Sequence, residues 1–351
     1  MPIRRLLCTA ALVFVAASSG WAIPITLNTT ASTAPGTLAG DAFAAAAARV
    51  GALFTDPINI YLNVDFQALG PGILGGADVT VLGSAFSYTT VRNALIADAT
   101  SDLDFQAVAN LPAAPSLQFL TQSSGSSTRT LDNDGSNNNR FLALPQATAR
   151  ALGLFSATST NPDASITFSS LFAWDFDPSD GITPGTFDFV GVATHEILHS
   201  LGFVSGVDIL DGNPNTDLNP FAVWRPLDLF RYSADSVAAG PGVLDLGVGG
   251  TPYFSVDGGA TNLGLFSTGR TRGDGQQASH WKDNLNLGLM DPTLAAGELG
   301  VLRTSDLQAL DAIGFNLASV PELDPRGSFL GVTFVLLGLL SLQRRTTLQT
   351  R

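Results

Sequence analysis

The 351-residue sequence contains a single cysteine, Cys8, and charged residues make up only 13% of it, whereas hydrophobic residues make up 45%. This composition excludes an intrinsically disordered chain, which would need high charge and few apolar groups. The formal net charge is -13, from 17 Lys and Arg against 30 Asp and Glu. Such a negative balance argues against nucleic acid or an anionic membrane surface as a partner. The length allows one large or two ordinary domains with a substantial core.

The N-terminal segment is predicted to be a secretory signal peptide rather than part of the fold. Residues 1–22 carry two arginines near their start, Arg4 and Arg5, continue with an apolar stretch and end in Gly20-Trp21-Ala22, which offers a cleavage site. The sequence therefore predicts an exported protein. Because Cys8 lies within this segment, the exported chain would have neither a disulfide nor a reactive thiol.

A second apolar segment, 329–342, lies near the C-terminus and is followed by a pair of arginines. It is shorter than the ~20 residues of an ordinary membrane-spanning helix, and the basic pair would stay on the cytoplasmic side. Together with Val320-Pro321-Glu322, the segment resembles a PEP-CTERM sorting signal of Gram-negative bacteria, although Leu323 stands where that pattern has proline. The resemblance implies an extracellular or cell-surface protein, transient membrane anchoring through 319–351, and removal of this tail by an exosortase-type processing enzyme.

Helix and strand signals mix between these ends, without an internal repeat. Residues 58–66 alternate apolar and polar side chains, which predicts a strand with one buried face. The other predicted elements are strands over 77–82 and 165–175, helices over 41–54, 88–98, 145–153 and 304–313, and a long loop over 122–139. We therefore expect an α+β fold with a small twisted mixed sheet. Its parts would be an N-terminal subdomain, 23–202, and an irregular C-terminal subdomain, 203–318.

The clearest helix pattern lies over 188–202, where Asp188 can cap the first turn and Gly202 can end the last. This helix contains His195-Glu196-Ile197-Leu198-His199. Two histidines four residues apart lie on one helix face, close enough to bind one metal ion, and burying them without a partner would be costly. Zn²⁺ binds histidine nitrogen at ~2.0–2.1 Å, and a catalytic zinc site keeps one position open for water. Glu196 would then be the general base that takes a proton from this water.

A catalytic site of this kind needs a third protein ligand. In the compact metzincin pattern it would fall at position 205, but Ser205 cannot replace an imidazole. The remaining histidine of the chain is His280, and we expect it to complete the site. Asp208, close to the motif in sequence, and Glu298 are the alternatives.

The surroundings of His280 carry a family resemblance. Ser279-His280-Trp281 is followed by Leu289-Met290-Asp291-Pro292, and together with the segment 195–203 these residues resemble the leishmanolysin-type branch of the metzincin zinc metalloproteases. The resemblance covers about 187–315 and implies a metzincin-like fold with an active-site helix. It also implies the functional residues: zinc ligands His195, His199 and His280, general base Glu196, and Met-turn residue Met290. That family is rich in disulfides, which the exported chain lacks, so we expect a bacterial relative rather than a close homologue.

The same resemblance implies that the strand before the helix is a sheet edge that binds an extended peptide substrate. Residues 165–174 occupy that place, and we expect Phe168, Ser170 and Phe172 to contact a peptide that adds there as a further strand. Acidic residues gather within 132–135, 175–180 and 208–217. They offer oxygen ligands for Ca²⁺, but none has EF-hand spacing, and solvated acidic loops are the alternative.

The sequence therefore predicts an exported zinc endopeptidase that hydrolyses a protein or peptide substrate through a metal-activated water. No covalent intermediate and no nucleic-acid partner are expected. Two alternatives stay open. An exported matrix or adhesion protein with a structural metal site would need a fourth protein ligand such as Asp208, and a zinc hydrolase could act on a substrate other than a peptide.

Overall fold

The computed structural model describes residues 22–318. The predicted signal peptide, apart from its last residue, and the predicted sorting tail over 319–351 lie outside the described residues. Within them, no helix combines the length and the apolar character needed to cross a membrane. The fold is α+β with small mixed sheets, as the sequence predicts.

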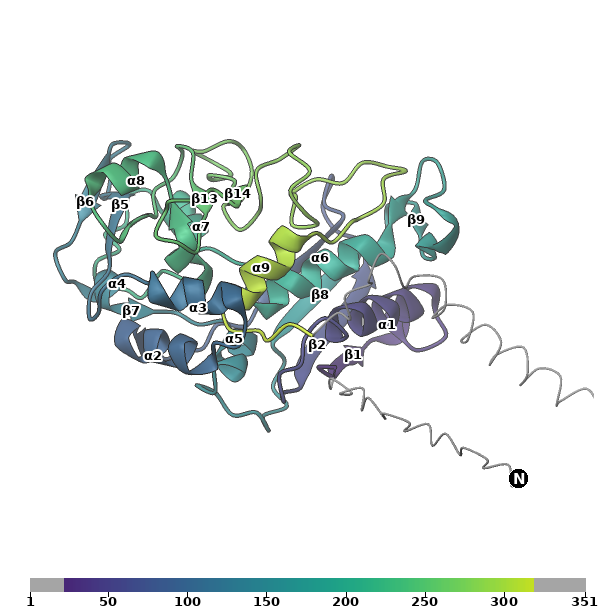
Figure 1. The fold of residues 1–351 in the computed structure, drawn as a ribbon. Helices are drawn as coiled ribbons and strands as arrows, with labels where there is room; N and C mark the ends of the chain where they lie inside the picture. Colours follow the sequence, from purple (N-terminus) through teal and green to yellow (C-terminus); the bar gives the residue numbers. More distant parts are fainter. Residues whose placement is uncertain (1–21, 319–351) are drawn as a thin grey trace, which may run out of the picture. The chain divides into compact units, whose positions relative to one another are not determined.

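Residues 25–169 contribute a four-stranded mixed sheet (Figure 1). Its strands follow the order β1 (Ile25–Thr29), β2 (Ile60–Gln67), β8 (Ala164–Ser169) and β3 (Gly75–Val79). The first three run parallel, whereas β3 is antiparallel to β8, with Ala77 opposite Ile166. The strand β3 is therefore an edge of the sheet.

The prediction that residues 165–174 form the substrate-binding edge is wrong. The strand β8 pairs with β2 on one side and with β3 on the other. Phe168 is fully buried in the core, and Ser170 and Phe172 lie beyond the end of the strand. Alternation of apolar and polar residues identifies a strand with one buried face, but it does not distinguish an inner strand from an edge strand.

Two helices, α1 (Leu38–Gly51) and α6 (Phe189–Leu201), pack against each other and against this sheet (Figure 1). The ring centroid of Phe43 in α1 lies 4.9 Å from that of Phe168 in β8 and 5.0 Å from that of Phe189 in α6. Buried alanines, including Ala46, allow α1 to approach its neighbours closely. This packing fixes α6 on the sheet.

The remaining elements are mostly short. The helices are α2 (Tyr88–Asp98), α3 (Asp102–Ala109), α4 (Asn137–Arg140), α5 (Gln146–Ala151), α7 (Val207–Gly212), α8 (Ala234–Ala239) and α9 (Thr304–Ala312). The strands are β4 (Phe86–Ser87), β5 (Gln118–Gln122), β6 (Arg129–Asp132), β7 (Phe141–Leu142), β9 (Trp174–Asp175), β10 (Phe187–Asp188), β11 (Arg231–Tyr232), β12 (Val243–Asp245), β13 (Tyr253–Phe254) and β14 (Gly264–Leu265). Because β6 lies within 122–139 and α4 begins there, the prediction of a long loop over these residues is wrong.

The two predicted subdomains share a sheet. The strand β12, from the C-terminal part, pairs in parallel with β5, from the N-terminal part, and β5 in turn pairs with β6. The end of the described chain returns to the N-terminal part as well, because Leu317 forms an isolated bridge with Phe54. The described residues up to Leu317 belong to one compact unit.

Candidate metal centre

Helix α6 carries two of the three histidines, and residues at both of its ends fix its limits. The Asp188 carboxylate caps the first turn by accepting the Gly191 N–H at 2.8 Å. Gly202 ends the helix with a φ of 129°, where a Cβ would lie 2.2 Å from the Thr148 hydroxyl oxygen. His195 and His199 therefore lie one turn apart on the same face, as the sequence predicts.

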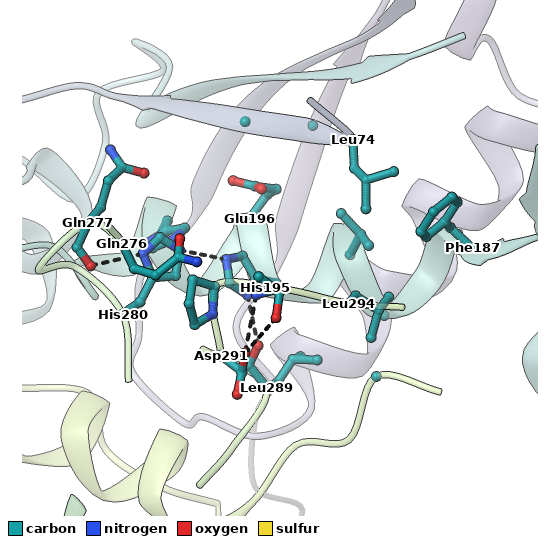
Figure 2. A pocket seen from close by; sticks show the side chains of 18 of the residues that line it. Leu74, Phe187, His195, Glu196, Gln276, Gln277, His280, Leu289, Asp291 and Leu294 are labelled. Carbon is teal, nitrogen blue, oxygen red and sulfur yellow. Dashed lines mark hydrogen bonds between the residues drawn. The ribbon is translucent and has the colours of Figure 1, made fainter. Parts of the chain in front are cut away.

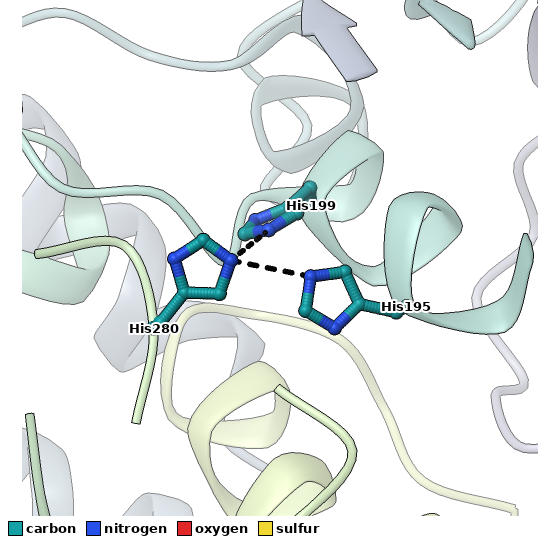
Figure 3. Close-up of side chains that lie close together, drawn as sticks. All are labelled: His195, His199 and His280. Atoms are coloured by element: carbon teal, nitrogen blue, oxygen red, sulfur yellow. Dashed lines mark hydrogen bonds between the residues drawn. The ribbon is translucent and has the colours of Figure 1, made fainter. Parts of the chain in front are cut away.

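The three histidines of the chain meet at one point (Figure 3). The Nε2 atom of His280 lies 3.2 Å from Nε2 of His195 and 3.1 Å from Nε2 of His199. Nitrogens at the corners of a tetrahedral zinc site with ~2.0–2.1 Å bonds would be about 3.3–3.4 Å apart. Among the residues that the structure describes, no other group of three or more His, Cys, Asp or Glu side chains brings its ligand atoms so close together.

The second ring nitrogen of each histidine contacts a backbone carbonyl, and this contact fixes the tautomer. The Nδ1 distances are 2.7 Å from His195 to Leu289, 2.7 Å from His199 to Phe203, and 3.3 Å from His280 to Gln277. A carbonyl oxygen can only accept, so the proton is on Nδ1 and each Nε2 presents a lone pair. The dashed contacts in Figure 3 therefore join two lone pairs, which repel each other unless a cation lies between them.

Burial keeps the three imidazoles neutral. Loss of solvent lowers the pKa of His195 to about 4 and that of His280 to about 3. It also lowers the pKa of His199 well below its ordinary range, and the neighbouring imidazoles add to this effect. Neutral imidazole is the form that binds a metal ion, so the donor set fits zinc in number, charge state and spacing.

Glu196 lies between α6 and the edge strand β3 (Figure 2). Its exposed fraction is 7%, and burial raises the pKa of its carboxyl to about 8, although a hydrogen bond from the Ala77 N–H of β3 opposes this rise. Glu196 is not part of the group of ligand atoms formed by the histidines. Without a cation nearby, this carboxyl holds its proton at neutral pH, and a divalent cation at the histidines would lower its pKa and make the carboxylate available to accept a proton.

Met290 is fully buried, and its neighbour Leu289 contacts the site through the carbonyl that accepts from His195. The Asp306 carboxylate, in the first turn of α9, accepts the Leu289 N–H at 2.7 Å and the Met290 N–H at 3.2 Å. It also accepts the indole N–H of Trp281 at 2.8 Å. One buried carboxylate thus holds the turn predicted to contain Met290. Sequence reasoning missed Asp306, because its only visible signal is an acidic residue in the first turn of a predicted helix.

The other candidates for the third ligand contact backbone groups instead. The Asp208 carboxylate accepts the N–H groups of Ala278 and Ser279, at 2.7 and 3.1 Å. The Glu298 carboxylate accepts the Ala295 N–H at 2.9 Å. Neither residue belongs to the group of converging ligand atoms.

A cavity of about 1030 Å³ surrounds the histidines and Glu196. It is apolar near Leu74, Phe187 and Leu294, and polar near Gln276 and Gln277 (Figure 2). Residues 72–77, which include the first part of β3, form part of its wall. Of the three side chains predicted to contact substrate, Phe172 lines this cavity, whereas Phe168 and Ser170 are not among the lining residues.

The acidic clusters predicted as calcium sites contact their own loops or a neighbouring one. Asp132 accepts from the side-chain amide of Asn139 at 3.1 Å, Asp175 accepts the Thr183 N–H at 2.8 Å, and Asp211 accepts the Thr271 N–H at 2.7 Å. These are contacts of carboxylates that stabilise loops. Calcium binding stays a prediction.

No protein-family model matches the chain, and neither a curated protein nor a solved structure matches it. The geometry of the site and the residues quoted above therefore carry the functional argument.

Proposed function

We propose that the protein is an exported zinc-dependent endopeptidase of the metzincin type. The observation that supports this most strongly is the convergence of three Nε2 lone pairs, 3.1–3.2 Å from His280 to each of the other two, at the wall of a large cavity. Zinc held by His195, His199 and His280 would polarise a scissile carbonyl and acidify water. Zinc proteases of this kind use a neighbouring carboxylate as the base, and Glu196 occupies that place.

The residues of the chain would divide the work as follows. The carbonyls of Leu289, Phe203 and Gln277 hold the three rings with Nε2 toward the centre. Glu196 accepts a proton from the attacking water and returns it to the leaving amine. Because water attacks the substrate directly, no covalent intermediate with the protein forms.

The edge strand β3 supports a polypeptide as the substrate. Among the described residues it pairs on one side only, with β8, and its first residues line the cavity next to Glu196. An extended peptide can add to such an edge through main-chain hydrogen bonds. We therefore place substrate binding at 75–79 instead of at 165–174.

The metzincin assignment combines the mixed sheet, the helix α6 and the buried Met290 in a turn that contacts the first histidine through Leu289. Export through residues 1–22 and anchoring through 319–351 belong to the same proposal. A matrix protein with a structural metal site fits less well, because a closed zinc site needs four protein ligands. Among the described residues only three converge.

Replacing Glu196 tests the proposal. Glu196→Gln keeps the size of the side chain but removes the base, so we expect one zinc ion per chain, as in the wild type, and a 10²- to 10⁴-fold slower cleavage of a denatured protein. Zinc content is measured by atomic emission and cleavage by the release of new amino termini. Asp102→Asn, at an exposed acid that does not line the cavity, is the control and should change neither quantity.

Two results would contradict the proposal. One is unchanged cleavage by Glu196→Gln at full zinc content. The other is a zinc-loaded wild type that cleaves no polypeptide but hydrolyses a small ester or amide, which would favour the non-peptide hydrolase.

A further inference from the structure

His280 reaches the site on an irregular segment, in contrast to the two histidines on α6. The segment 264–281 contains the short strand β14 and two isolated bridges, Phe266 with Trp281 and Gly269 with Gln276. A helix fixes its side chains through its own repeating hydrogen bonds, whereas such a segment needs other groups to fix its backbone. The position of His280 therefore depends on the groups that hydrogen-bond to its neighbours in the chain.

Asp208 holds the two residues that precede His280. It lies in the first turn of α7, and its Oδ1 accepts the Ala278 N–H at 2.7 Å, while its Oδ2 accepts the Ser279 N–H at 3.1 Å. The Ser279 hydroxyl also donates to Oδ2 and accepts the Ser205 N–H at 2.8 Å. Three donors from the segment that carries the third histidine thus end on one carboxylate.

Asp208 also connects this segment to the helix with the other two histidines. Only residues 202–206 separate α6 from α7, so the carboxylate is joined to His199 by a short stretch of chain. On the other side, the buried guanidinium of Arg231 donates to the Ala278 carbonyl at 3.4 Å and to the Ser267 carbonyl at 2.8 Å. Both backbone polar groups of Ala278 are therefore held.

We propose that Asp208 is the positioning residue for the third ligand, and that the affinity of the centre for zinc depends on it although it does not touch the ion. Groups that orient metal ligands without binding the metal often matter for affinity in this way. The proposal rests on the zinc centre put forward above, but it does not require that the centre cleaves peptides.

The same helix provides a matched control. Asp211, one turn further along α7, accepts the N–H groups of Thr271 and Arg272 at 2.7 and 2.9 Å. Both carboxylates therefore hold the same irregular segment through two backbone N–H groups. They differ in that only Asp208 contacts the residue adjacent to His280.

The test compares the full-length wild type with Asp208→Asn and Asp211→Asn. Zinc affinity is measured by competition with a chromophoric chelator, and ligand geometry by the visible absorption of the Co²⁺-loaded proteins. We expect Asp208→Asn to weaken zinc binding 10- to 100-fold and to reduce the intensity of the Co²⁺ bands. Asp211→Asn should leave the affinity and the Co²⁺ spectrum close to those of the wild type.

Wild-type affinity and an unchanged Co²⁺ spectrum in Asp208→Asn would overturn the proposal, and so would an equal loss in both variants, since that would show a general effect on the segment. If Asp208→Asn does not fold, Ser279→Ala replaces it, because it removes one of the three hydrogen bonds to Asp208. We then expect roughly fivefold weaker binding. A wild type that binds zinc but cleaves nothing would contradict the endopeptidase alone, whereas one that binds no zinc would overturn both proposals.

Discussion

The candidate centre combines two regions that position imidazoles in different ways. In α6, the backbone supplies its own hydrogen bonds, and only the ends need help, from Asp188 and Gly202. In the irregular chain over 264–303, backbone N–H groups that no regular structure pairs are accepted by the half-buried carboxylate of Asp208 and the buried carboxylate of Asp306. An irregular backbone can therefore hold a metal ligand in place, but each support is a single carboxylate whose removal leaves N–H donors unpaired.

The largest expected effect is the loss of zinc affinity when one histidine is removed from either region. His195→Ala and His280→Ala should each weaken zinc binding by roughly 10²- to 10³-fold, because each removes one of three bonds to the ion. Gln277→Ala is the control, since it keeps the backbone carbonyl that accepts from His280. Zinc affinity is measured by chelator competition. If His280→Ala retained wild-type affinity, the irregular segment would not contribute a ligand.

The next effect is the loss of stability when a carboxylate that accepts backbone N–H groups is removed from either region. Asp306→Ala leaves the backbone N–H groups of Leu289, Met290 and Arg303 and the Trp281 indole without their acceptor. We expect it to lower the free energy of unfolding by about 3–4 kcal/mol. The corresponding change at the helix, Asp188→Ala, leaves the N–H groups of Gly191 and Gly300 without their acceptor and should cost about 2 kcal/mol. Urea unfolding of the metal-free proteins measures the free energy of unfolding of both variants. Equal losses would show that the irregular region depends on its carboxylate no more than the helix does.

The parts of the molecule that could be predicted from the sequence depend on short-range spacing. The face shared by His195 and His199, the cap at Asp188 and the end at Gly202 involve residues within four positions of one another, where helix geometry decides. The helix over 88–98 coincides with α2 for the same reason. The convergence of His280 on the other two was expected only because it is the remaining histidine of the chain.

The supports of the irregular segment could not be predicted, because they join residues far apart in sequence. The contact between Asp208 and Ala278 spans 70 positions, and the sequence suggested Asp208 as a metal ligand instead. The place of β8 inside the sheet also depends on partners on both sides, which alternation does not show. Two-residue strands such as β4 have no pattern of their own, since only pairing with a distant segment defines them.

A third region differs from both. There, acidic side chains lie close to one another, whereas the carboxylates of Asp208 and Asp306 face N–H donors. Asp56, Asp98, Asp104 and Asp311 lie close enough to raise one another's pKa values. The side-chain amide of Asn316 donates to Asp56 at 3.3 Å and to Asp98 at 3.5 Å. Burial is the main cause of the shifts, and it raises the pKa of Asp56 to about 6 and those of Asp98 and Asp311 to about 7.

The smallest predicted effect is a dependence of stability on pH that comes from this acidic cluster. An unfolded Asp has a pKa of about 3.9, so between that value and about 7 the folded protein binds more protons than the unfolded one. Stability from these groups is therefore complete below pH 4 and is lost as the pH rises through 6 to 7. The buried histidines titrate in the opposite direction over the same range, because their folded pKa values lie below the ordinary one, so the effect is read as a difference between variant and wild type. Between pH 5 and pH 8, Asp311→Asn, which removes one of the charges, should gain about 1 kcal/mol relative to the metal-free wild type in urea unfolding, whereas Asp102→Asn, at an exposed acid, should not. If the free energy of unfolding of Asp311→Asn depended on pH as that of the wild type does, the acidic cluster would not destabilise the folded protein. Carboxylates that face one another would then be tolerated as well as carboxylates that face N–H donors.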